Sequence, residues 1–136
     1  MIVTFIVPGK PYAQKRPRFS RKIGRAFDPK ENQTFASAVQ AIALPAFKTP
    51  IAGPVSLEVT AVFEPAASLS KPKRNALLGS AHTQKPDVDN LVKAIADALN
   101  RIAWTDDSQI ASMRIVKRWG PVAQTTVTVE AMVIPE

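Results

Sequence analysis

The segment KPDVDNLVKAIADALNRIAWTDDSQI, from Lys85 to Ile110, combines clustered acids with a helical pattern in a chain of net charge +7. Asp87 and Asp89 precede an apolar stripe at helical spacing, and the adjacent Asp106 and Asp107 follow it. Negative charge gathered in a basic chain is stabilised by a bound cation, and carboxylate oxygens suit Mg²⁺ or Mn²⁺. The pattern therefore predicts a helix after Pro86. It also predicts a metal site if folding brings the later acids back to the helix start.

A simpler interpretation stays open for each acid. Asp87 or Asp89 could cap the helix, because a short carboxylate accepts from unpaired amides of the first turn, and the later acidic pair could be a solvated turn. Lys93 shares a helix face with Asp89, and Asp97 continues that row as a partner of Lys93 or Arg101. Paired carboxylates that hold a metal suit phosphodiester hydrolysis, so a nuclease is the functional alternative.

The motif resembles the signature of the RusA family of Holliday-junction resolvases, which are often carried by phages and prophages. The resemblance rests on Lys85–Leu91, on Lys93, and on Trp104–Ile110. In that family an Asp-x-Asp-Asn opens a helix, a lysine follows four residues after the second Asp, and an Asp-Asp-x-Gln precedes a hydrophobic residue. Each element occurs in this order here, and the compound motif is far more specific than Asp-x-Asp alone.

The resemblance implies the roles of individual residues. Asp87, Asp89 and Asp107 would hold Mg²⁺, with Mn²⁺ able to substitute, and Asp106 would assist. Lys93 would stabilise charge on the cleaved phosphate or orient the attacking water. The implied function is a metal-dependent endodeoxyribonuclease that resolves four-way junctions by paired nicks in DNA recombination and repair. The resemblance also implies an α+β fold and a homodimer.

Two other functions remain compatible with the sequence. The chain could be a binding module for branched DNA that keeps the fold without cutting, in which case the acids would only organise the helix and the turn. It could also be a nuclease for flaps or RNA, because all these substrates present the same phosphodiester. Cleavage of a labelled junction with Mg²⁺ or EDTA would separate the first alternative from a resolvase.

Composition restricts the number of domains, the partners and the cofactors that the chain can have. A length of 136 residues predicts one domain, residues 1–136, and the basic charge favours a polyanionic partner. There are no cysteines, so disulfides and thiolate metal sites are excluded. No apolar run approaches a membrane span and no secretion signal is present, which predicts a cytoplasmic protein without membrane contact. The chain also lacks a phosphate-binding glycine loop, so no nucleotide cofactor is expected.

Two basic segments are candidates for DNA binding. The first, from Lys10 to Arg25, contains no acid and carries Tyr12 and Phe19, which could stack on exposed bases; a solvated basic loop is the alternative. The second leads directly into the Asp-x-Asp motif, where His82 could contact phosphate, transfer a proton, or be a surface residue with no role. The candidate phosphate-binding residues are Lys10, Lys15, Arg16, Arg18, Arg21, Lys22, Arg25, Lys71, Lys73, Arg74 and Lys85.

The other elements follow from periodicity and turn residues. Asp28-Pro29 predicts a helix start with Asp28 as the cap, and alternation predicts strands at 2–7, 55–64, 110–119 and 126–133, the last two paired as a hairpin. A short helix is expected at 70–78. Together these elements predict an α+β domain with a mixed or antiparallel sheet of about four strands and helices packed on one face. Phe47 and Ile51 are candidates for burial between two chains.

Overall fold

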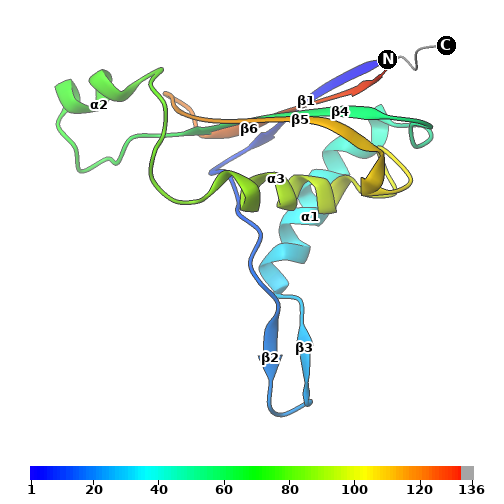
Figure 1. Ribbon diagram of the computed structural model, residues 1–136. Coiled ribbons are helices and arrows are strands. Elements are labelled where there is room, and N and C mark those ends of the chain that lie inside the picture. The colour runs from blue at the N-terminus through cyan, green and yellow to red at the C-terminus, as the bar shows by residue number, and fades with distance from the viewer. Residues whose placement is uncertain (133–136) are drawn as a thin grey trace.

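A four-stranded sheet with two helices under one face forms the body of the protein (Figure 1). The computed structural model describes residues 1–132. Its strands are β1 (Ile2–Pro8), β2 (Arg18–Ser20), β3 (Arg25–Phe27), β4 (Val55–Phe63), β5 (Ile110–Trp119) and β6 (Gln124–Ala131), and its helices are α1 (Lys30–Ala43), α2 (Lys71–Leu77) and α3 (Val88–Leu99), with 3₁₀ turns at Leu44–Ala46 and Asp107–Gln109. The predicted α+β class and the helix after Pro86 are confirmed. Val133, at the end of the last predicted strand, lies outside the described residues.

The sheet is mixed, with strand order β1-β6-β4-β5. β6 runs antiparallel to both β1 and β4, whereas β5 runs parallel to β4. The predicted hairpin of the last two strands is therefore wrong. β4 lies between them because it is the most apolar strand, and a central position pairs both of its hydrogen-bonding edges.

The connection from β5 to β6 crosses the end of β4 and depends on Gly120. The Gly120 amide donates to the carbonyl of Phe63 at 2.9 Å. A Cβ atom built at Gly120 would collide with the side chain of Val62. Glycine at this position therefore permits the close approach that lets the chain pass over β4.

The main core lies between the sheet and helices α1 and α3. Leu57 and Val59 of β4 and Val127 of β6 are completely buried, and they alternate with more exposed residues as a one-face strand requires. Phe47 and Ile51 are buried in the same core. These two residues are already covered by their own chain, so the prediction that they are buried between chains is wrong.

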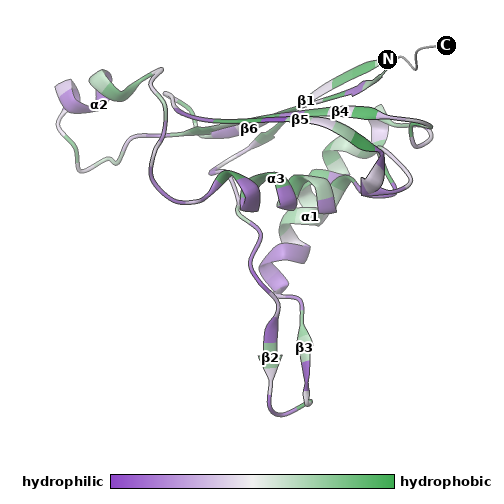
Figure 2. Cartoon of the chain, in the orientation of Figure 1, coloured by the Kyte–Doolittle hydropathy of each residue, from purple (hydrophilic) through white to green (hydrophobic). Residues whose placement is uncertain are grey.

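Two parts of the chain extend from this body. The β2–β3 hairpin projects beyond the helices, and α2 lies past one end of the sheet (Figure 1). The hairpin carries both hydrophilic and hydrophobic segments (Figure 2). Within residues 1–132, none of the helices has the length and apolar character needed to cross a membrane.

Candidate active site and nucleic-acid interface

The N-terminus of α3 carries the first acidic pair. Asp87 occupies the N-cap position, but its carboxylate makes no capping hydrogen bond. Asp89 lies in the first turn, and both side chains are exposed. The capping interpretation therefore does not account for Asp87, whose oxygens stay directed to solvent at the positive end of the helix dipole.

The backbone that leads into this pair is fixed by Lys117 of β5. Its ammonium group donates to the carbonyl oxygens of Gln84 and Pro86. A lysine that bonds two carbonyls of one loop restricts the conformations available to that loop. The position of Asp87 is thus tied to the sheet through a residue that the sequence pattern did not single out.

Asp107, from the second acidic pair, is held by a buried tryptophan. Trp104 is 0% exposed, and its indole Nε1 donates to Asp107 Oδ1 at 2.7 Å. Because a buried indole N–H requires an acceptor, this bond fixes the carboxylate against the core. The sequence signal is a tryptophan three residues before an aspartate; Asp107 was predicted as a metal ligand, but its bond to Trp104 was not predicted.

Asp106 has a different role from its neighbour. Its side chain accepts from the Ser108 amide at 2.9 Å, and Gln109 Oε1 accepts from the Asp106 amide, which completes a capping box. The hydrogen bonds from Ser108 keep the pKa of the Asp106 carboxyl below its usual value. Gln109 also donates to the carbonyls of Ile51 and Gly53. Asp106 and Gln109 therefore build the turn that presents Asp107.

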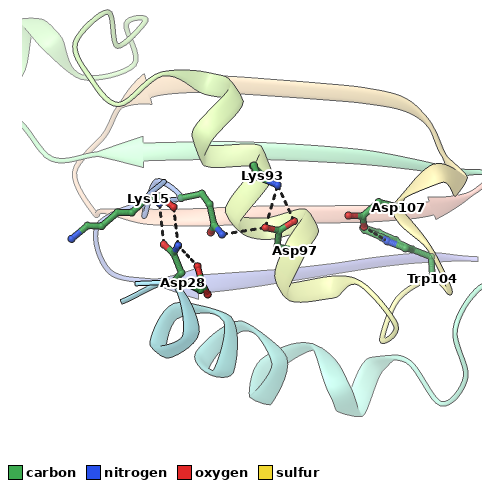
Figure 3. Close-up of polar contacts among 8 residues, drawn as sticks. Lys15, Asp28, Lys93, Asp97, Trp104 and Asp107 are labelled. Carbon is green, nitrogen blue, oxygen red and sulfur yellow. Dashed lines mark hydrogen bonds and ion pairs between the residues drawn. The ribbon is translucent and has the colours of Figure 1, made fainter. Parts of the chain in front are cut away.

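Lys93 and Asp107 line one open cavity of about 340 Å³ together with Asp97. Lys93 Nζ lies 3.4 Å from Asp97 Oδ2, and the same oxygen accepts from Gln14 Nε2 at 3.1 Å (Figure 3). The lysine side chain is 62% exposed, so the ion pair contributes little to stability and leaves the ammonium group able to move to a ligand. Asp89 precedes Lys93 by one helical turn.

The three acids implied as metal ligands lie at two ends of this region. Within residues 1–132, no three His, Cys, Asp or Glu side chains are grouped closely enough to hold a metal ion. Asp107 lies beside the second half of α3, near Lys93 and Asp97, while Asp87 and Asp89 lie at its start. The donor chemistry nevertheless fits Mg²⁺, because exposed carboxylates are hard oxygen ligands. Metal ligation by Asp87, Asp89, Asp107 and Asp106 stays a prediction.

Most of the first basic segment lies in a projecting arm, which we define as residues 16–27. A hairpin occupies most of the arm, and it was not predicted because its strands have only three residues each. Its five cations, Arg16, Arg18, Arg21, Lys22 and Arg25, are exposed and make no ion pair within the described part of the chain. Phe19 is 67% exposed on the same arm. Free cations beside exposed aromatics match the chemistry of a nucleic-acid backbone and its bases.

The other candidate DNA-binding cations lie outside the arm and differ in their surroundings. Lys15 pairs with Glu31 at 3.5 Å. Lys71 and Arg74 lie on α2 and line a separate cavity of about 500 Å³, away from the arm. Lys10, Lys73 and Lys85 are exposed. The arm and α2 therefore carry predicted DNA-binding residues on two separate surfaces.

His82 is buried, which excludes the alternative of a surface histidine with no role. It is 5% exposed and stacks on Phe63, with 4.0 Å between ring centroids, while Trp119 packs against it at 4.4 Å. Burial lowers the pKa of the imidazole, and the charge of Lys117 acts in the same direction. The stacked ring packs the loop against Phe63 of β4 and Trp119 of β5.

A comparison with known proteins decides the family. The family model described as "Endodeoxyribonuclease RusA" matches residues 8–130. The chain belongs to the RusA endodeoxyribonuclease family. It is also similar to "Uncharacterized protein YqaN" of Bacillus subtilis (strain 168), with 38% identity over 123 residues that cover 85% of this chain and 86% of that protein. The family match over residues 8–130 spans both the acidic motif and the basic arm.

Membership in the RusA family implies endodeoxyribonuclease activity on branched DNA junctions. The suspected resemblance is confirmed by a match over nearly the whole chain. The geometry adds which residues meet in space: Lys93 and Asp107 share a cavity, and Trp104 and Gln14 support it. Gln14 and Trp104 were not among the predicted site residues.

Proposed function

We propose that this protein is a Mg²⁺-dependent endonuclease that resolves four-way DNA junctions by paired nicks, in DNA recombination and repair. The observation that carries the proposal is the family match over residues 8–130, which includes the complete segment Lys85–Ile110. The shared cavity of Lys93 and Asp107 supports it, because a cation and a fixed carboxylate together suit an attack on phosphate.

In this proposal the chain's own residues bind and position the DNA. The arm cations contact the phosphate backbone, and Asp87, Asp89 and Asp107 would hold Mg²⁺, with assistance from Asp106 and with Mn²⁺ able to substitute. When bound, the metal supplies Lewis-acid activation of the attacking water and neutralises charge on the phosphate. Lys93 adds positive charge where negative charge develops, and Trp104 keeps Asp107 in place. No covalent intermediate is needed.

A substrate panel tests the proposal directly. Labelled four-way junction, flap, linear duplex, single-stranded DNA and structured RNA are incubated with the protein, with Mg²⁺ or with EDTA. Symmetric nicks confined to the junction and to Mg²⁺ are expected. Binding without cutting in every metal tested would support the non-catalytic module, and preferred cutting of flaps or RNA would support the other nuclease alternative.

Neutralising the arm is expected to weaken binding to every DNA. In Arg16→Gln/Arg18→Gln/Arg21→Gln, fewer condensed counterions are released, so the slope of log affinity against log salt should flatten by up to about three units. Titrating labelled DNA at several salt concentrations measures this slope. Lys48→Gln, at an exposed lysine beyond the far end of α1, is the control. An unchanged slope in the triple variant would mean that the arm does not touch phosphate.

The proposed active unit is a symmetric homodimer. A four-way junction has approximate two-fold symmetry, and the sequence contains one acidic motif, so two chains would place one site on each of two opposed strands. Wild-type chains are mixed with tagged Asp89→Asn chains, and the mixed dimer is isolated. One nick per junction with little full resolution is expected. A monomeric mass at assay concentration, or full resolution by the mixed dimer, would contradict the dimer.

A further inference from the structure

The base of the arm is joined to α1 by one buried amide. Asn32 lies in the first turn of α1 and is 3% exposed. Its Nδ2 donates to the Lys15 carbonyl at 2.9 Å and to Asp28 Oδ1 at 2.8 Å. Lys15 directly precedes the arm and Asp28 directly follows it, so this single NH₂ group bonds both ends of the projecting segment.

The other side of the amide is equally occupied. Asn32 Oδ1 accepts from the Lys15 amide at 3.0 Å and from the Tyr12 hydroxyl. Tyr12 in turn stacks on Phe35 of α1, with 4.8 Å between ring centroids. An asparagine amide offers two donors and two acceptors, and all four are used here. A fully satisfied buried polar group holds its neighbours in one arrangement.

The same base is also attached to α3. The Gln14 amide donates to the Asn90 carbonyl at 2.9 Å, and its side chain donates to Asp97, the partner of Lys93. The residue before Lys15 is therefore bonded to the helix that carries Asp89 and Lys93. Figure 3 shows these contacts as one row from Asp28 and Lys15 to Asp97 and Lys93.

We propose that Asn32 is a positioning residue that fixes the direction of the arm relative to the acids and Lys93 of α3. With the Asn32 hydrogen bonds intact, DNA on the arm cations meets α3 in a defined orientation. When these bonds are removed, the arm keeps its charge but samples many directions, so ordering the arm on DNA becomes unfavourable. The proposal adds a positioning residue to the proposed nuclease, and it rests on that function only where the cutting rate is measured.

Hydrogen exchange and DNA binding of the 136-residue protein test the role of Asn32. In Asn32→Ala, amides of residues 15–28 should exchange at least about tenfold faster, while those of β4 and β6 keep their protection. Junction affinity should fall about tenfold with the salt slope unchanged, because every arm cation remains. The single-turnover cutting rate at saturating protein should also fall. Gln33→Ala, at the exposed neighbour of Asn32 on α1, should leave all three unchanged.

A second variant keeps the test decisive if Asn32→Ala does not fold. Tyr12→Phe removes one of the four bonds and keeps the stacked ring, so it should shift exchange, affinity and cutting in the same directions by a smaller factor. Unchanged arm protection, or a flattened salt slope, would overturn the proposal. If wild-type protein binds junctions without cutting them, the nuclease proposal fails, and exchange and affinity still decide the role of Asn32.

Discussion

Replacing Asp89 by asparagine is expected to abolish cutting of a four-way junction while the junction remains bound. Asparagine keeps the size of the side chain and removes the charge that would hold the metal. If the metal contributes several kcal/mol to the transition state, its loss slows cutting by on the order of a thousandfold or more, at about 1.4 kcal/mol per factor of ten. Asp87→Asn should behave in the same way. Single-turnover cutting and gel-shift titration measure the two effects separately.

Binding should survive because the cations lie elsewhere. The arm carries its charge on residues 16–27, and Asp89 makes no ion pair within the described residues. Removing a carboxylate near the bound phosphate also reduces repulsion, so affinity measured without metal should stay equal or rise. A variant that still cuts at a near wild-type rate would exclude that residue from the site.

The adjacent pair Asp106 and Asp107 provides the matched control. Asp107→Asn should abolish cutting, because Asp107 lines the cavity with Lys93. Asp106→Asn should keep cutting within about tenfold, because asparagine caps as well as aspartate and can still accept from the Ser108 amide. The opposite ranking would make Asp106 the residue needed for cutting and Asp107 only the acceptor for Trp104.

The sequence was sufficient to predict the helices and strands that have a long, regular pattern of apolar residues. The stripe Leu91, Ile95 and Leu99 predicted α3, and the alternation along residues 55–64 predicted β4. Strand order was not predictable, because the pairing of β5 with β4 depends on contacts across the sheet that no local pattern records. The turn at Gly120 looked like a hairpin turn, but its glycine is needed for the crossing over Val62.

The supports of the site were harder to predict than its motif. Asp28 was expected to cap α1, but Pro29 holds the N-cap position and Asp28 accepts from Asn32 instead. A signal for Asn32 was present: it lies three residues before Phe35 and seven before Val39, on the apolar face of α1. A polar residue on such a face requires partners, and those partners come from residues distant in sequence.

Lys93→Ala is expected to reduce the cutting rate by about a hundredfold to a thousandfold while junction affinity changes little. The lysine lines the cavity beside Asp107, so its charge can act on the reacting phosphate. It is one cation among many for binding, because net charge and the arm supply most of the attraction. Single-turnover rates at saturating protein, binding titrations and thermal melting are measured on the same preparations.

Asp97→Asn separates catalysis by Lys93 from a purely structural ion pair. Both variants lose the Lys93–Asp97 pair, an exposed pair at i and i+4 that contributes only a few tenths of a kcal/mol, about 0.3–0.5. Their melting temperatures should therefore fall equally little. Cutting should fall far more in Lys93→Ala, because Asp97→Asn retains the cation and an acceptor for Gln14. Equal rates of cutting in the two variants would mean that Lys93 acts only through its pair with Asp97, and that another group supplies positive charge to the phosphate.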